Sequence, residues 1–199
     1  MVTAFVDRLL SKCTDHLSLL VAPATLDKVY DFGAEAFDSI FDVLRSTVPC
    51  IVLDVPHVWT GWARRILVGA DDILIVAAPD LANLRNTKNL MDILRNARPN
   101  DNRPYYCLNQ VGMPKRPEIK PADFAKALEF EPVASIPFEP ALFGTAANNG
   151  QMVAEVSAGH RATETFRQLA QTLTGRTETK RSRSNLLTPL IEKLMRRQA

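Results

Sequence analysis

Residues 73–80 have the sequence ILIVAAPD, and this stretch decides the fold class. Its first six residues are apolar without alternation, which is typical of a strand covered on both of its faces. Pro79 ends the run, since proline cannot donate a hydrogen bond to a neighbouring strand, and Asp80 follows it. Such a strand predicts a mostly parallel sheet between two layers of helices.

Short apolar runs of this kind recur along the chain and alternate with amphipathic segments. Further strands are predicted at residues 17–22, 50–53, 105–108 and 133–136. Apolar residues spaced three and four apart predict helices over residues 2–12, 33–47, 84–95, 124–128, 152–156 and 163–173. The alternation implies right-handed crossovers, and therefore an α/β fold with a mostly parallel sheet and helices on both faces.

The composition limits the class of protein. The 199 residues are 46% hydrophobic and 23% charged, which is ordinary for a globular protein with one core. No apolar run approaches the roughly 18 residues of a membrane-spanning helix, and the first ten residues lack the pattern of a secretory signal. Cys13, Cys50 and Cys107 have no metal-ligand spacing, so we expect buried free thiols in a reducing cytoplasm.

The composition also predicts how the chain is divided. Gly175 is the expected C-cap of the last helix of the body, and the residues after it change in character. Residues 176–199 hold seven basic and two acidic side chains, so the net charge of +2 leaves the body mildly acidic. We expect residues 1–175 to form a partial domain, 176–187 a polar basic linker, and 188–199 a basic amphipathic helix.

Polar groups follow the predicted strands, where an open parallel sheet binds its ligands. They include Asp54, Asp80, Asn109 and Glu139. Asp54 stands out, because a carboxylate directly after an apolar strand is what a P-loop enzyme uses to hold Mg²⁺, usually through a water. The alternative interpretation of Asp54 is a helix or turn cap after a buried strand.

Glycine-rich phosphate-binding loops are absent from the sequence. Neither Gly-x-x-x-x-Gly-Lys-Ser/Thr nor Gly-x-Gly-x-x-Gly occurs, and the eight glycines are dispersed. Without such a loop, no dense group of backbone N–H donors is available for a triphosphate. A lone loop histidine such as His57 is more often a surface or packing residue than a catalyst, and neither a metal cluster nor a nucleophile–base pair is visible in the sequence.

Six segments together resemble MinD/ParA-like P-loop ATPases, and among these the pilus-assembly family of CpaE and TadZ. They are CIVLDVPH at 50–57, GADD at 69–72, APDLANLRN at 78–86, CLNQ at 107–110, IPFE at 136–139 and AANNGQ at 146–151. Each segment is weak alone, but their order and spacing are specific, and the resemblance runs from about Phe5 to the C-terminus.

The resemblance implies a Rossmann-like P-loop NTPase fold, with ATP and Mg²⁺ held between two protomers. It places Asp54 at the Mg²⁺-associated position, through a water. Pro56, His57 and Gly61 correspond to a switch II-like loop. The nucleotide base would contact Asn109, Pro137 and Phe138, whereas Gln110 departs from the arginine that often follows this asparagine in the family.

The resemblance also implies an N-terminally truncated ATPase domain. The phosphate-binding loop and the switch I aspartate of the family lie upstream of the segment that begins at Val2, so Met1 is expected to be an internal start, a split gene or an artificial boundary. The first strand would be lost with that loop, which would leave a central sheet edge exposed. We therefore expect no tight nucleotide binding and no catalysis by this chain alone.

The function implied for the intact protein is that of a pilus-assembly and localisation ATPase of the Tad/Flp secretion system. It would bind Mg-ATP, dimerise and act with the pilus secretion machinery, in the cytoplasm or peripherally at the inner membrane. The alternative is a nucleotide-free interaction module that recruits a partner or the membrane.

The C-terminal segment predicts a short amphipathic helix. Thr188 and Pro189 have the residue types of an N-cap and a first helical position. The apolar side is formed by Leu190, Ile191, Leu194 and Met195, and the polar side includes Lys193, Arg196 and Arg197. An anionic membrane surface, a partner subunit and the body of the same chain remain open as its contacts. Nucleic acid is less favoured, since the segment has no aromatic residue for base stacking.

Overall fold

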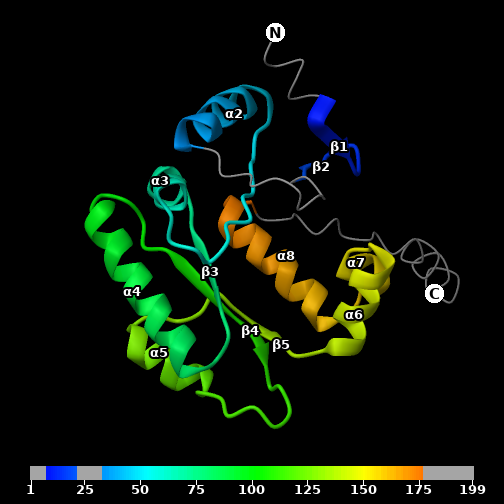
Figure 1. Cartoon of the computed structure of the whole chain (residues 1–199). Coiled ribbons are helices and arrows are strands. Elements are labelled where there is room, and N and C mark those ends of the chain that lie inside the picture. The colour runs from blue at the N-terminus through cyan, green and yellow to red at the C-terminus, as the bar shows by residue number, and fades with distance from the viewer. Residues whose placement is uncertain (1–7, 22–32, 177–199) are drawn as a thin grey trace, which may run out of the picture. The chain divides into compact units, whose positions relative to one another are not determined.

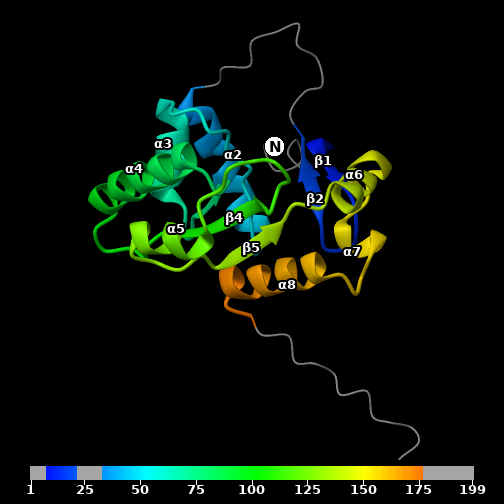
Figure 2. The same cartoon turned by 90° about the horizontal axis from the view of Figure 1, so that it is seen from below.

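The structure is a computed structural model, and it describes residues 8–21 and 33–176. Two compact units share the chain. Among the described residues, unit 1 comprises 8–21, 33–73 and Asn89–Pro104, and unit 2 comprises Leu74–Lys88 and 105–176. Figures 1 and 2 show the elements of both units from two directions.

Unit 2 is built on a parallel three-stranded sheet. Its strands are β3 (Leu74–Ala77), β4 (Tyr105–Val111) and β5 (Ala134–Pro137), in the order β3-β4-β5. The register pairs Val76 with Cys107 and Cys107 with Ala134. The pairing of β4 with β5 shifts between Leu108 and Val111, just before β4 ends. The predicted strands at 73–78, 105–108 and 133–136 are thus confirmed.

The helices of unit 2 lie on both faces of this sheet (Figures 1 and 2). They are α4 (Leu81–Ala97, whose residues from Asn89 belong to unit 1), α5 (Pro121–Leu128), α6 (Pro140–Asn149), α7 (Val153–Val156) and α8 (Arg161–Thr174). The completely buried Tyr106 stacks on Phe124 of α5, with 5.7 Å between the ring centroids. Cys107, the next residue of β4, lines the opposite face together with Leu169 of α8. The alternation along one strand therefore separates the α5 layer from the α8 layer.

Local sequence signals fix where these helices begin and end. The Asp80 carboxylate caps α4 by accepting the Asn83 backbone N–H at 2.8 Å. Pro121 occupies the first turn of α5, and the His160 side chain caps α8. Gly175 ends α8 in the left-handed conformation, with φ of 62°, which confirms the predicted C-cap.

Unit 1 contains a hairpin and two helices besides its part of α4. Strands β1 (Leu10–Lys12) and β2 (Ser18–Leu20) pair antiparallel. Helices α2 (Ala34–Thr47) and α3 (Gly61–Gly69) pack through Phe37 and Trp62, whose ring centroids lie 5.0 Å apart. The Thr60 hydroxyl caps α3 by accepting the Ala63 backbone N–H at 3.3 Å. Leu19 and Leu20 of β2 are exposed, so β2 is not covered within the described part of unit 1.

Several sequence predictions are wrong. Residues 50–53 do not form a strand: the described chain gives them no pairing partner, and Val52 is 89% exposed. Residues 10–12 form a strand instead of continuing a helix, while most of the predicted helix 2–12 and all of the helix 188–199 lie outside the described residues. Helices α3 and α6 were not predicted. Cys13 and Cys50 are exposed, so of the three free cysteines only Cys107 is buried as expected.

Candidate functional site

A groove lies on the α8 face of the unit 2 sheet and has a volume of about 460 Å³. Its lining is mainly apolar. It consists of Leu74 and Val76 from β3, Cys107, Asn109 and Gln110 from β4, Ile136 and Pro137 from β5, the following Phe138–Pro140, Phe143 of α6, and Phe166 and Leu169 of α8. The polar members come from the carboxyl ends of β4 and β5, which is where an open α/β sheet binds ligands.

The groove combines flat apolar surface with an amide group at one end. Phe143 and Phe166 meet edge to face, with 6.3 Å between the ring centroids. Pro137 is the last residue of β5 and Phe138 follows it, and Asn109 is half-buried near the end of β4. Apolar walls with a few convergent polar groups are typical of a small-molecule site, and an amide beside rings suits a planar heterocycle. The predicted base-contacting residues Asn109, Pro137 and Phe138 are thus brought together by the fold.

Gln110 has an unusual backbone conformation. Its φ is 57°, in the left-handed region that a residue with a side chain adopts at a cost of about 1–2 kcal/mol. It occupies the place where the β4–β5 register shifts, and its backbone N–H donates to the Asn109 side-chain oxygen at 2.9 Å. The turn therefore fixes the Asn109 side chain at the end of the groove.

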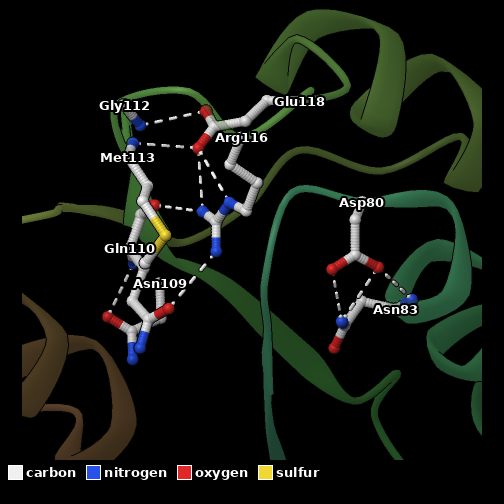
Figure 3. A network of polar contacts seen from close by, with 8 residues as sticks. All are labelled: Asp80, Asn83, Asn109, Gln110, Gly112, Met113, Arg116 and Glu118. Carbon is white, nitrogen blue, oxygen red and sulfur yellow. Dashed lines mark hydrogen bonds and ion pairs between the residues drawn. The ribbon is translucent and has the colours of Figure 1, made fainter.

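An arginine from the following loop holds this turn in place (Figure 3). Arg116 Nη2 donates to the Gln110 backbone carbonyl, and Arg116 Nη1 donates to Gln110 Oε1 at 3.3 Å. The same guanidinium forms an ion pair with Glu118, with 2.8 Å between Nη2 and Oε1. The Arg116 and Glu118 side chains are only 21% and 18% exposed, so solvent screens their interaction less than it would a surface pair.

Glu118 is in turn anchored to the backbone of the loop. Its carboxylate accepts the Gly112 N–H at 2.9 Å and the Met113 N–H at 3.0 Å. The Gly112 hydrogen bond is the main reason that the pKa of Glu118 lies below its usual value, and the Arg116 guanidinium lowers it further. Glu118 is therefore ionised near neutral pH, which keeps Arg116 in place.

The loop after β3 is hydrogen-bonded to the loop after β4 at the same edge of the sheet. Asp80 accepts the Asn83 backbone N–H and also the Asn83 side-chain amide, at 2.9 and 3.0 Å (Figure 3). These bonds are the largest causes of the lowered pKa of Asp80, and the positive charge of Arg116 also contributes. The Ile119 N–H donates to the Pro79 carbonyl at 2.8 Å. The loops after β3 and β4 are thus linked at the carboxyl edge of the sheet.

A histidine–carboxylate pair involves Glu139, which lies after β5 and just before the start of α6. His160 Nε2 lies 2.8 Å from Glu139 Oε2, and His160 Nδ1 accepts the Ala162 backbone N–H at 3.1 Å. Glu139 is the residue just before α6 and His160 is the residue just before α8, so the pair links the starts of the two helices. The sequence gives no sign of this pair, since Glu139 lies 21 residues before His160 in the chain.

The residues expected around Mg²⁺ belong to unit 1. Asp54, Pro56, His57 and Gly61 are exposed, and residues 50–60 have no regular structure. The sequence predicted a buried strand before Asp54, and the structure has none there. Both interpretations of Asp54, as a metal ligand at a strand end and as a cap after a buried strand, assumed that strand. In the described ranges 8–21 and 33–176, no group of three or more His, Cys, Asp or Glu residues is placed to hold a metal ion. The tail residues from Leu190 to Arg197 lie outside the described part of the chain.

Sequence-based searches give no relative: no model of a known family matches, and neither does any curated protein. Solved structures do match, and 15 chains resemble this one. A ParA family ATPase from Chlorobium tepidum TLS aligns with a TM-score of 0.73 at 20% identity, over 84% of this chain and 69% of that one. The cell division ATPase MinD from Pyrococcus furiosus aligns with a TM-score of 0.72 at 19% identity, over 85% and 70% of the two chains. The MinC:MinD cell division protein complex from Aquifex aeolicus aligns with a TM-score of 0.60 at 20% identity, over 73% of this chain and 60% of that one.

These likenesses define the class of fold. The α/β arrangement with a parallel three-stranded sheet flanked by helices matches the Rossmann-like P-loop NTPase fold of ParA and MinD proteins. At about 20% identity the likeness establishes the fold and leaves the activity to be argued from the site. Among the described residues, none of the helices has the length and apolar character to cross a bilayer.

Proposed function

We propose that this chain is the base-binding part of a MinD/ParA-like ATPase of the CpaE/TadZ pilus-assembly kind. The observation that carries the proposal is the groove of unit 2, which gathers Asn109, Pro137 and Phe138 at the carboxyl ends of β4 and β5. In this proposal the Asn109 amide reads adenine, and Pro137 and Phe138 pack against the base. ATP and Mg²⁺ are ligands of the intact protein, with Asp54 holding Mg²⁺ through a water and Pro56, His57 and Gly61 forming the switch II-like loop.

The open edge of the sheet supports an additional strand in the intact protein. In the described chain β3 pairs only with β4, so the backbone groups on its other side have no strand partner. A parallel sheet is normally covered on both faces and has few such edges. We propose that the phosphate-binding loop follows that additional strand, which is why this chain alone is not expected to hydrolyse ATP.

The biological role is the finer part of the proposal. The six segments that resemble CpaE and TadZ favour a role in placing Tad/Flp pilus machinery in the cytoplasm or at the inner membrane. Self-association as a dimer is proposed with it, and a matching MinD solved in a complex with MinC makes binding of a further protein reasonable. The basic segment at 188–199 would add a contact with an anionic membrane surface.

The second candidate is an interaction module that never binds nucleotide. It is favoured by the exposed apolar residues Val52, Val58 and Trp59 of unit 1, which would be suited to contact another protein. It is also favoured by Gln110, since the family often has arginine there.

The two candidates are separated by a nucleotide titration followed by NMR. The ¹⁵N-labelled chain is titrated with Mg-ATP and, separately, with Mg-GTP, up to about 10 mM, which reaches affinities of only about −3 kcal/mol. Base binding predicts saturable shifts of the Asn109 side-chain amide and the Phe138 backbone amide with ATP, and smaller shifts with GTP. Asn109→Ala should abolish the difference between the nucleotides. A folded chain without shifts around the groove would support the interaction module instead.

A further inference from the structure

We propose that Arg116 is a positioning residue for base recognition, and that it acts through Gln110 on Asn109. The inference rests on the proposed function of the groove and adds a residue from outside the six family-like segments. Arg116 is absent from the groove lining, so its effect must pass through the residues it holds.

The first step is the contact between Arg116 and Gln110. The guanidinium bonds both the backbone carbonyl and the side-chain oxygen of Gln110, which fixes the main chain and the side chain together (Figure 3). A left-handed Gln110 needs such support, because residues with a Cβ rarely adopt this conformation without contacts that impose it. A planar group with several fixed donors can make these bonds simultaneously, whereas a lysine ammonium at the same position cannot match their geometry.

The second step is the anchoring of Arg116 itself. Glu118 bonds the guanidinium through Oε1, and the same carboxylate accepts the N–H groups of Gly112 and Met113. The ion pair is therefore held in place by hydrogen bonds to the backbone of the loop that follows β4. We refer to Arg116 and Glu118, with the Gln110 that they hold, as the loop clamp.

The third step leads from the loop clamp to the ligand. The Gln110 N–H donates to Asn109 Oδ1, so the orientation of the Asn109 amide depends on the conformation of Gln110. With Oδ1 held from the backbone side, the amide is presented in one orientation at the end of the groove. This chain has Gln110 directly after Asn109, where the resembling family often has arginine. Here Arg116, six residues after Gln110, orders the turn instead.

The experiment compares Arg116→Ala and Arg116→Lys with Lys115→Ala, all in the full chain. Lys115→Ala is the matched control, since it removes one positive charge from the same loop and leaves the clamp contacts intact. Amide hydrogen exchange of Gln110 measures the order of the turn, and NMR titrations with adenosine and with Mg-ATP measure binding. Adenosine has no phosphate, so a loss of its affinity cannot come from lost attraction between charges.

The clamp predicts that Arg116→Ala accelerates exchange at Gln110 by about tenfold or more, as expected when charge-assisted hydrogen bonds are lost. Arg116→Ala should lower the affinities for adenosine and for ATP by the same factor as each other. Arg116→Lys should lower them less, and Lys115→Ala should leave the adenosine affinity unchanged. A loss confined to ATP would overturn the inference, because Arg116 would then act as a charge. Unchanged exchange at Gln110 would also overturn it. If the wild-type chain binds neither ligand, the proposed function fails together with the base-reading role, while the exchange data still show whether the clamp exists.

Discussion

Removing a single oxygen atom from Tyr106 should destabilise unit 2 measurably without disturbing its packing. Tyr106 lies in β4, three residues before Asn109, and it is 0% exposed. Its hydroxyl donates to the Phe130 carbonyl at 2.7 Å, and its ring lies against the Phe124 and Phe130 rings at 5.7 and 6.0 Å. Tyr106→Phe removes this donor and keeps both ring contacts.

The expected loss of unfolding free energy for Tyr106→Phe is about 1–2 kcal/mol, the cost of removing one partner of a buried hydrogen bond. Tyr106→Ala would also lose the ring contacts and leave a cavity, so it should cost about 3–5 kcal/mol. Urea unfolding followed by circular dichroism measures both, provided that the slope with urea is unchanged. Tyr105→Phe is the matched control, because Tyr105 is only half-buried, and it should change stability little. Equal stabilities of Tyr106→Phe and wild type would refute the idea that this hydrogen bond fastens β4 to the loop before β5.

The remaining predictions concern the thiols, the loop clamp, the cap of α8 and the tail. Burial raises the pKa of Cys107 to about 11, so a thiol reagent at pH 8 should react quickly with the two exposed cysteines and slowly with the third until urea is added. The folded pKa of Glu118 is depressed below 4.5, so its contribution to stability is present above pH 4.5 and is lost as the pH falls through the folded pKa. Glu118→Gln should therefore be less stable than wild type at pH 6 and approach it as the pH falls through the folded pKa of Glu118; a pH-independent difference between the two urea midpoints would contradict this. His160→Ala removes the cap of α8 and should cost about 1 kcal/mol, whereas His160→Asn, which can still cap, should cost less in the same urea assay. In the tail, Leu190→Glu with Leu194→Glu should abolish any sedimentation with anionic liposomes, and unchanged sedimentation would remove the amphipathic-anchor hypothesis.

The parallel sheet could be predicted from the sequence because its strands show the pattern of full burial. Residues 73–78 and 105–108 are apolar throughout, residues 133–136 are apolar except for Ser135, and the structure pairs the three runs as β3, β4 and β5. Residues 50–53 have the same pattern but no partner in the described chain, and a strand without a neighbour leaves its backbone groups unpaired. The pattern thus indicates which residues can form a strand, while pairing decides whether they do.

The two unpredicted helices have weak periodic signals. Helix α6 contains Pro140, Gly144 and several alanines, so its sequence shows no clear apolar stripe. Helix α3 is short and starts with Gly61, although Thr60 is a residue type that commonly caps helices and could have indicated its start. Capping residues would therefore have located α3 where periodicity did not.

The candidate site was only partly visible in the sequence. The resemblance to MinD/ParA-like ATPases indicated Asn109, Pro137 and Phe138, and the groove brings them together. Arg116 and Glu118 lie in the irregular loop 112–120 between β4 and α5, where no periodicity signals which side chains meet. Their contacts depend on the left-handed Gln110, and such a backbone conformation is not marked in a sequence when a residue other than glycine adopts it.

The most direct test of the account is to locate the adenine ring on the chain. Isotope-filtered NOE spectra of the labelled chain with unlabelled adenosine report which protein protons lie within about 5 Å of the base, and adenosine isolates the base from any phosphate contact. Base binding in the groove predicts NOEs from the adenine protons to Phe138 and to the Asn109 side-chain amide, and Asn109→Ala should weaken them. NOEs to residues away from the groove of unit 2, with none to Phe138, would contradict the assignment of this groove as a base-binding site.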